Sequence, residues 1–228
     1  MDRGLYVAAA GMAAEQVRQD MIANDLANTQ TAGYKPDRAV QTDFSEVLLS
    51  NRQDGSAVGP VGQGPAITDR YTDLGPEPIH DTDHPLDMAI QGEGYFAVRT
   101  PQGVRYTRDG EFTAAADGTL ADAQGNAVLS PTGQPIRVGA GGVVDPSAVG
   151  VFAVDDPVKA GDDLFTGTQR GTARGVVRTS ALEASGVDAA KAMVDMIKSL
   201  RSYESGQKVI QTIDTTLGKA AGTVGSIR

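Results

Sequence analysis

The chain has 228 residues, a formal net charge of −9, and no cysteine or tryptophan. This length allows one or two domains with a core, and aliphatic residues and methionine must fill that core because only 5% of the residues are aromatic. The lack of cysteine excludes disulfides, thiolate metal sites and cysteine nucleophiles. The acidic balance argues against nucleic acid or an anionic membrane surface as a partner, since both require clustered basic residues.

The N-terminal sequence does not predict a secretory signal peptide. It contains an acidic residue, an early glycine and then Glu15, and it lacks a sustained apolar run. No other stretch approaches the roughly 20 apolar residues that are needed to span a bilayer. From the residues alone we expect a soluble, cytoplasmic protein with no direct membrane insertion, unless a dedicated route exports it.

The first predicted element is a helix over residues 5–29. Its seam positions recur in alternating steps of three and four, which is the spacing of a coiled coil with a polar centre. These positions are Leu5, Ala8, Met12, Glu15, Gln19, Ile22, Leu26 and Thr29. An ordinary amphipathic helix that packs on its own domain is the alternative. We expect Gly33 to close the final turn in a left-handed conformation and Pro36 to prevent continuation.

The next segment changes character twice. Residues 38–50 hold a short apolar run that includes Phe44 and Val47, and we interpret this run as a partial helix. From residue 51 to residue 65 the composition turns to Gly, Ser, Pro and polar residues. A loop of this kind, with few apolar anchors, is expected to be either mobile or ordered only by a neighbour.

The centre of the chain predicts antiparallel β structure. Residues 87–100 suggest two short strands around a bend at 92–94. Asp-Gly pairs at 109–110 and 117–118 predict hairpin turns, because tight hairpin turns need a positive φ. Further strands are expected at 104–107, 111–114, 119–121, 128–129, 136–144 and 149–154, with another turn at 124–126. Residues 155–186 are expected to be irregular.

The last predicted element is a helix over residues 187–217, preceded by cap candidates at 185–188. Its seam follows the same step of three and four. The seam positions are Met193, Met196, Leu200, Tyr203, Gln207, Ile210, Asp214 and Leu217, flanked by Val194, Ile197, Val209 and Ile213. Gly206 inside this helix costs about 1 kcal/mol relative to alanine, which predicts a close neighbour or a bend there.

Each candidate chemical site has a simpler structural explanation. Two histidines and three aspartates lie within residues 80–87 and could bind a transition metal, but prolines flank the run and the chain has only 2 histidines. A polar turn that leads into a strand explains this run better. The Gly-rich bend at 92–94 lacks the context of a nucleotide-binding loop, and no Gly-x-Ser-x-Gly elbow is present. We therefore predict no catalytic residue, no metal and no cofactor.

Residues 24–35 read Asn-Asp-Leu-Ala-Asn-Thr-Gln-Thr-Ala-Gly-Tyr-Lys, and they closely resemble the N-terminal signature of bacterial flagellar rod and hook proteins. In that signature Asn-x-Leu-Ala-Asn and a threonine precede Gly-aromatic-Lys at this spacing. Residues 85–96 and 106–112 resemble the family's entry into its β domain and its first hairpin. Residues 193–217 are similar to its C-terminal signature, so the resemblance covers both ends and the core of the β region.

The resemblance implies an α+β fold, in which N- and C-terminal coiled-coil-like helices flank a central all-β domain of short antiparallel strands. The expected domains are 1–50 with the N-terminal rod helix, 51–75 as a Gly/Pro-rich loop, 76–185 as the β domain and 186–228 as the C-terminal rod helix. The implied function is a structural subunit of the flagellar basal-body rod, which polymerises through its terminal helices for motility. Residues 5–12 and 35–40 resemble the distal rod protein slightly more than the proximal one.

The resemblance also implies partners and a location. The expected partners are copies of the chain, other rod and hook subunits, the flagellar type III export apparatus and the rings around the rod. Family members pass the export channel unfolded and without a cleaved signal, so the expected location is the basal body. Two rival functions are an assembly factor that binds axial subunits and a metal-dependent hydrolase that uses residues 80–87.

An assembly interface on the terminal helices follows from the same resemblance and spacing. The expected interface residues are Leu5, Met12, Ile22, Asn24, Leu26, Asn28, Gly33, Met193, Met196, Leu200, Tyr203, Ile210 and Leu217. Polar seam residues are expected to fix the register of the helices at a cost in stability. These residues are Glu15, Gln19, Gln207 and Asp214.

Overall fold

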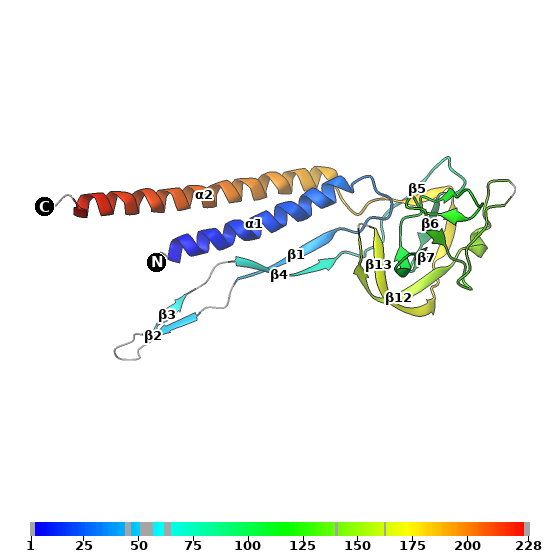
Figure 1. Cartoon of the computed structure of the whole chain (residues 1–228), viewed down its shortest axis with the longest axis horizontal. Helices are drawn as coiled ribbons and strands as arrows, with labels where there is room; N and C mark the ends of the chain where they lie inside the picture. Colours follow the sequence, from blue (N-terminus) through cyan, green and yellow to red (C-terminus); the bar gives the residue numbers. More distant parts are fainter. Residues whose placement is uncertain are drawn as a thin grey trace. The chain divides into compact units, whose positions relative to one another are not determined.

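The computed structural model describes residues 3–43, 47–50, 57–61, 65–139, 141–161 and 163–225. One α-helix opens the described chain and another closes it, with β-strands between them (Figure 1). The fold is therefore α+β, as the sequence predicts. In chain order the elements are α1 (Arg3–Ala27), β1 (Asp37–Asp43), β2 (Val47–Ser50), β3 (Ala57–Val61), β4 (Pro65–Thr72), β5 (Ile79–Asp81), β6 (Met88–Gln91), β7 (Tyr95–Thr100), β8 (Gly103–Thr107), β9 (Thr113–Ala114), β10 (Leu120–Ala121), β11 (Ala127–Val128), the 3-10 helix η1 (Pro146–Ala148), β12 (Val151–Lys159), β13 (Leu164–Thr172), β14 (Val176–Thr179), β15 (Ala181–Glu183) and α2 (Ala189–Gly225).

Contacts divide the chain into two compact units that do not follow chain order. The helical unit comprises Met1–Leu26, Asp37–Tyr71 and Ala189–Arg228. The β unit comprises Ala27–Pro36 and Thr72–Asp188. Each unit thus gathers segments that lie far apart in the sequence, and the end of the N-terminal signature belongs to the β unit.

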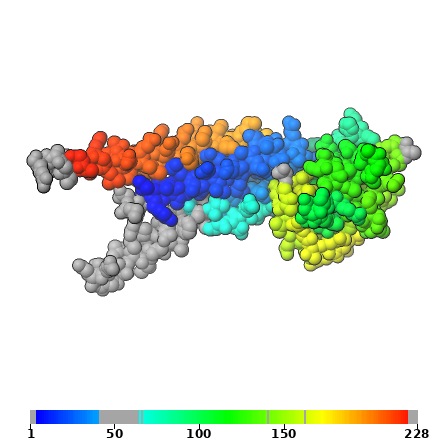
Figure 2. Space-filling model, viewed as in Figure 1, coloured from blue at the N-terminus to red at the C-terminus, as the bar shows by residue number. Residues whose placement is uncertain are grey.

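In the helical unit α1 and α2 run antiparallel and side by side (Figures 1 and 2). Gly4 lies near Ile213, because a Cβ at position 4 would be 3.4 Å from the Ile213 Cδ1. Gly206 lies against Met12, since a Cβ at position 206 would be 2.8 Å from the Met12 Cγ. The predicted close neighbour at Gly206 is therefore confirmed. In the part of the chain that the structure describes, neither helix is long and apolar enough to cross a membrane.

The segment between α1 and the β unit differs from the expectation. We expected a partial helix over residues 38–50, which is wrong, because β1 and β2 are strands. We expected a loop over residues 51–65, but β3 occupies residues 57–61 and pairs antiparallel with β2. Phe44 and residues 51–56 and 62–64 lie outside the described residues. The error has a physical reason: an apolar run of three or four residues fits a helix or a strand equally well, and only its pairing decides.

The β unit is built on a seven-stranded antiparallel sheet in the order β12-β13-β8-β7-β11-β10-β9, in which β12 also pairs with β7. The strands β12, β13, β8 and β7 therefore form a closed circuit, which leaves no free edge between them. Its core is apolar, and the Phe96 and Phe112 rings meet edge to face with centroids 5.2 Å apart. The fully packed core includes Met88, Ile90, Phe96, Val98, Phe112, Leu120 and Val128.

Several local predictions for the β unit are confirmed. Strands β6 and β7 flank the bend at residues 92–94. Gly118 and Gly125 have φ values of 79° and 85°, and they lie in the hairpin turns that join β9 to β10 and β10 to β11. A positive φ at these two positions explains why glycine is required there.

Three other predictions are wrong. Asp109-Gly110 is not a hairpin turn, because β8 pairs with β7 and β13 and not with β9. Glycine is needed at position 110 for a different reason, since a Cβ there would overlap the Met88 carbonyl oxygen. The described parts of residues 136–144 form no strand and make one isolated bridge, between Arg137 and Thr119. Residues 155–186, which we expected to be irregular, contain most of β12 and all of β13, β14 and β15. Much of β13 is exposed on both faces. Its sequence therefore lacks the alternation of apolar and polar residues that predicts a strand with one buried face.

Candidate assembly surfaces and the buried signature

The end of the N-terminal signature is buried in the β unit. Helix α1 ends at Ala27, six residues before Gly33, so the predicted role of Gly33 in closing the last turn is wrong. Gly33 has a φ of +63°, and a Cβ there would overlap the backbone carbonyl of Arg108. The close approach of these two backbone segments, combined with the left-handed conformation, is what requires glycine. Tyr34 and Lys35, which follow, are 0% and 1% exposed.

Lys35, Arg108 and Glu183 form a buried ion cluster. The Lys35 Nζ donates to the Glu183 Oε1 at 2.5 Å and to the Gly75 carbonyl at 2.6 Å. The Arg108 guanidinium donates to the Glu183 Oε2 at 3.0 Å and to the Gly92 carbonyl at 2.8 Å. Buried charges are tolerated only when they are paired and their remaining hydrogen-bonding groups find partners. The Glu183 carboxylate supplies that partner to both cations, and only 2% of its side chain is exposed.

Backbone contacts connect the same two segments. The Gly33 N–H donates to the Glu183 carbonyl at 2.9 Å, and the Gly186 N–H donates to the Tyr34 carbonyl at 2.9 Å. The Lys159 Nζ lies 4.0 Å from the centroid of the Tyr34 ring, within the range of a cation–π contact. The segment that follows α1 and the segment that precedes α2 are therefore packed together inside the β unit.

Sequence reasoning missed Glu183. It is the single acidic residue of the short strand β15. In this strand Ala181 and Glu183 are buried, and Leu182 between them is half-buried. An acidic residue on the buried side of an apolar strand was the available signal. Its partners Lys35 and Arg108 belong to motifs that the sequence singled out, but their separation of 148 and 75 residues from Glu183 hides the pairing.

One face of α2 packs against α1. The side chains on this face are buried or half-buried, and they recur in alternating steps of four and three. We call them the inner row: Ala192, Met196, Ser199, Tyr203, Gly206, Ile210 and Ile213. Gly206 and Ile213 make the contacts to α1 given above, and the Ser199 hydroxyl lies 2.6 Å from the Glu15 Oε2. Glu15 therefore does contact the opposite helix, whereas Gln207 and Asp214 are exposed.

A second apolar surface of α2 lies beside the inner row and points away from it. It consists of four large side chains within two turns, each about half exposed, which we call the outer patch. These residues are Met193 (52%), Val194 (50%), Ile197 (51%) and Leu200 (47%). Single exposed apolar residues are common on protein surfaces, whereas these four lie close together on one helix.

The structure separates the expected interface residues into three groups. Exposed are Leu5, Asn24, Met193, Leu200 and Leu217. Half-buried are Met12, Ile22, Leu26, Asn28, Met196, Tyr203 and Ile210. Gly33 is buried in the β unit. The expectation that these residues contact neighbouring subunits stays a prediction, and the exposed group is the part of it that a partner can reach without rearrangement.

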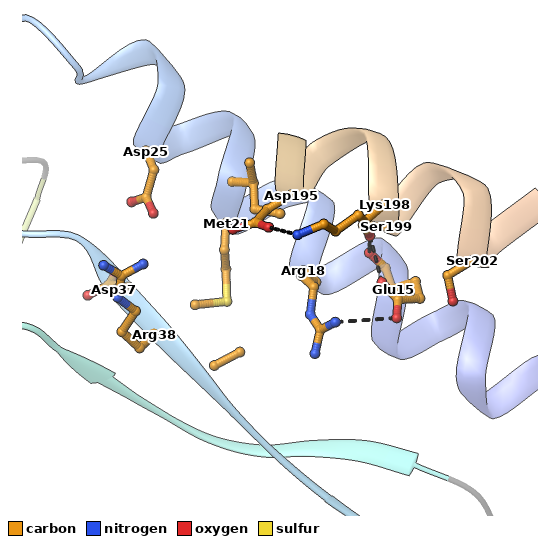
Figure 3. A pocket seen from close by; sticks show the side chains of 12 residues that line it. Glu15, Arg18, Met21, Asp25, Asp37, Arg38, Asp195, Lys198, Ser199 and Ser202 are labelled. Carbon is orange, nitrogen blue, oxygen red and sulfur yellow. Dashed lines mark hydrogen bonds and ion pairs between the residues drawn. The ribbon is translucent and has the colours of Figure 1, made fainter. Parts of the chain in front are cut away.

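A pocket of about 470 Å³ lies between α1, α2 and β1 of the helical unit (Figure 3). Two of its charged pairs each lie along one helix: Arg18 pairs with Glu15 at 3.5 Å in α1, and Lys198 pairs with Asp195 at 3.0 Å in α2. The hydrogen bond from Lys198 lowers the pKa of Asp195.

The histidine-containing run has the local structure that the sequence predicts. His80 lies on β5 and pairs with Leu182 of β15. The His84 carbonyl accepts the Asp87 N–H at 3.2 Å, and the Thr82 hydroxyl donates to the Asp87 carboxylate at 2.7 Å. Residues 82–87 are thus a polar turn that joins β5 to β6. Within the described residues, no group of three or more His, Asp or Glu side chains is arranged to hold a metal ion.

Comparisons with known proteins place these features in a family. Residues 5–35 match the model described as "Flagella basal body rod protein", and residues 178–223 match "Flagellar basal body rod FlgEFG protein C-terminal". Residues 89–164 match "Flagellar hook protein FlgE/F/G D1 domain". The three matches cover the N-terminal helix with its buried signature, the core of the β unit, and most of α2.

Whole-length relatives agree with these matches. The chain is 33% identical to the flagellar basal-body rod protein FlgG of Agrobacterium fabrum, over 93% of this chain and 95% of the relative. It is 30% identical to FlgG of Bacillus subtilis, over 95% and 97%. It is 29% identical to the flagellar basal-body rod protein FlgF of Caulobacter vibrioides, over the full length of both.

The chain belongs to the flagellar basal-body rod protein family, a family of structural proteins. It is a structural subunit of the rod, and its location is the flagellar basal body. The fold and the buried signature are thus those of a rod subunit.

Proposed function

We propose that this rod subunit assembles with copies of itself and with other axial subunits through coiled-coil-like contacts of α1 and α2, and that it carries no catalytic activity. The observation that carries the proposal is the outer patch, whose four side chains are each about half exposed to water. Covering them removes apolar area from water at about 25 cal/mol per Å². The thirteen interface residues expected from the sequence belong to this proposal, with the exposed group making the first contacts.

The position along the rod is also part of the proposal. The resemblance of residues 5–12 and 35–40 supports the distal rather than the proximal rod. The proposed arrangement of parts keeps the N-terminal rod helix with its following segment at 1–50, the Gly/Pro-rich segment at 51–75, the β domain at 76–185 and the C-terminal rod helix at 186–228. The export apparatus is the proposed partner before assembly, and the rings around the rod are proposed partners of the β unit afterwards.

Hydrogen exchange tests this function. Backbone amide exchange would be measured on the purified chain and on the same chain in isolated basal bodies. We expect amides of α1 and α2 to exchange more slowly in the basal body, because neighbouring subunits cover the helices. Amides of the β core, such as those of Phe96 and Val98, serve as the internal control and should be protected equally in both samples.

Two results would overturn the proposal. One is equal protection of both helices in the free chain and in the basal body, which would mean that subunit contacts lie elsewhere. The other is the absence of the chain from purified basal bodies, together with its capture by axial subunits in solution. That second result would favour an assembly factor.

A further inference from the structure

The inner row of α2 continues toward the C-terminus beyond the part that α1 covers. Its last half-buried member is Ile213, which lies near Gly4 of α1. The next position in the step of three and four is Leu217, and its side chain is 49% exposed. The same helix face therefore changes from covered to uncovered at an apolar residue. Because the covered part packs against a helix, the surface that fits its continuation is another helix face.

The outer patch is a helix face of the required kind. In the described residues it is the helix surface on which four exposed large apolar side chains lie within two turns. Leu217 and Ile197 are 20 positions apart on α2. In an α-helix that separation corresponds to about 30 Å and about 160° of rotation, so the two surfaces point to opposite sides and cannot meet within one chain.

We infer that the Leu217 end of α2 in one subunit packs on the outer patch of α2 in a second copy of this chain. The inference rests on the proposed function and specifies its contact. Two different surfaces meet in such a contact, so it does not close as a two-fold dimer and instead propagates as an open array. The flanking charges favour it as well, since the exposed Asp214 borders Leu217. Apart from Lys198, which is paired with Asp195, the exposed charges within one turn of the outer patch are Lys191, Arg201 and Glu204, with a net charge of +1.

A matched pair of charge substitutions provides the first test. Leu217 and Val209 are both on α2 and are exposed to almost the same extent, 49% and 47%. Val209 belongs neither to the inner row nor to the outer patch. We expect Leu217→Asp to lower recovery of the chain in purified basal bodies at least ten-fold, and Val209→Asp to leave recovery unchanged. Circular dichroism of both purified variants should match the wild type, because both sites are exposed.

Cysteine cross-linking identifies the occupant, and the chain has no cysteine of its own. In the Leu217→Cys/Ile197→Cys variant we expect disulfide-linked ladders of this chain in basal bodies after mild oxidation. The Val209→Cys/Ile197→Cys variant is the control and should give at least ten-fold less ladder. The two cysteines of one chain cannot pair with each other, because a disulfide requires Cα atoms within about 7 Å.

The outcomes separate this contact from the function on which it rests. Normal recovery of Leu217→Asp, or the absence of a ladder from a variant that does enter basal bodies, overturns the inferred contact and leaves the rod function standing. Loss of Leu217→Asp together with no ladder means that another subunit covers Leu217, which overturns the second copy as the occupant. Absence of the wild-type chain from basal bodies overturns the rod function itself.

Discussion

Glu183 connects three segments of the β unit that lie far apart in the sequence. Its carboxylate pairs with Lys35 and Arg108, and its backbone carbonyl accepts the Gly33 N–H. The signature lysine thus binds a residue of β15 inside the folded subunit. We conclude that the Gly-Tyr-Lys end of the signature stabilises the fold of the subunit.

We predict that Glu183→Gln lowers the free energy of unfolding by about 3–5 kcal/mol, because it leaves two buried cations without their shared anion. Urea denaturation measures this. The control is Asp81→Asn, which breaks the pair between Arg178 and Asp81, whose side chains are 44% and 77% exposed. An exposed pair contributes at most about 1 kcal/mol, so the control should change little. Equal effects of the two variants would contradict the role of the buried ion cluster.

Asp109 predicts a pH dependence of stability. Burial raises its pKa from 3.8 to about 7; the Glu111 N–H lowers it, and the nearby Asp163 adds to the rise. The folded chain therefore keeps a proton that the unfolded chain releases near pH 3.8. Since the unfolded state binds fewer protons in this window, the free energy of unfolding falls as the pH rises from about 4 to 7, by at most about 1.4 kcal/mol per pH unit.

The measurement is urea denaturation of the wild type and Asp109→Asn at pH 5 and pH 7.5. We expect the wild type to lose more stability between these values than the variant, since asparagine does not titrate. Asp117→Asn is the control, because Asp117 is exposed and hydrogen bonds from Thr119 lower its pKa. An identical pH dependence in wild type and Asp109→Asn would contradict the assignment.

At the scale of elements, the pairing of α1 with α2 depends on small residues. Gly206 admits Met12, and Ser199 binds Glu15 through a hydroxyl rather than through a bulky side chain. Short side chains at these positions let the helices approach, while large ones at Met196 and Tyr203 fill the space beside them. Helix packing of this kind, with ridges entering grooves, fixes which positions of α2 face inward.

Two glycines of α2 allow a matched test of this packing. Glycine to alanine inside a helix gains about 1 kcal/mol in helix propensity where nothing opposes it. At Gly218 an added Cβ meets nothing within 4 Å, so Gly218→Ala should raise thermal stability slightly. At Gly206 the same Cβ meets the Met12 Cγ, so Gly206→Ala should be less stable than Gly218→Ala by at least about 1 kcal/mol. Melting curves by circular dichroism decide this, and equal curves would contradict the close approach.

At the scale of the whole molecule, the two units differ in how far their large apolar side chains are buried within the subunit. The β unit closes a circuit of four strands over its own core. The helical unit leaves the outer patch and Leu217 in contact with water. This division fits the proposed assembly of the subunit through its helices.

The same division predicts weak self-association of the free chain. We expect the sedimentation coefficient of the wild type to rise with concentration, because the outer patch offers apolar area to a second copy. Ile197→Asp should reduce this rise. Val176→Asp is the control, since Val176 is exposed by 63% but lies on β14 in the β unit. A rise that survives Ile197→Asp would contradict the outer patch as the contact.

The sequence by itself determined the class of the two long helices and the family. The helices at both ends followed from a period near 3.6 residues, and the turns at Gly118 and Gly125 followed from the need for a positive φ. These features are local, because the residues that specify them are neighbours in the chain. The signature at residues 24–35 is equally local, and it led to the flagellar rod family before any contact was known.

Only the tertiary structure decided which apolar residues face inward. Met193 and Met196 both belong to an apolar row in the sequence, yet one is exposed on the outer patch and the other lies on the inner row. Periodicity cannot choose between two apolar faces of one helix, because the choice depends on where α1 lies. The pairing of Glu183 with Lys35 likewise depends on contact between segments 148 residues apart. Contacts at such distances are properties of the folded chain, and no local pattern encodes them.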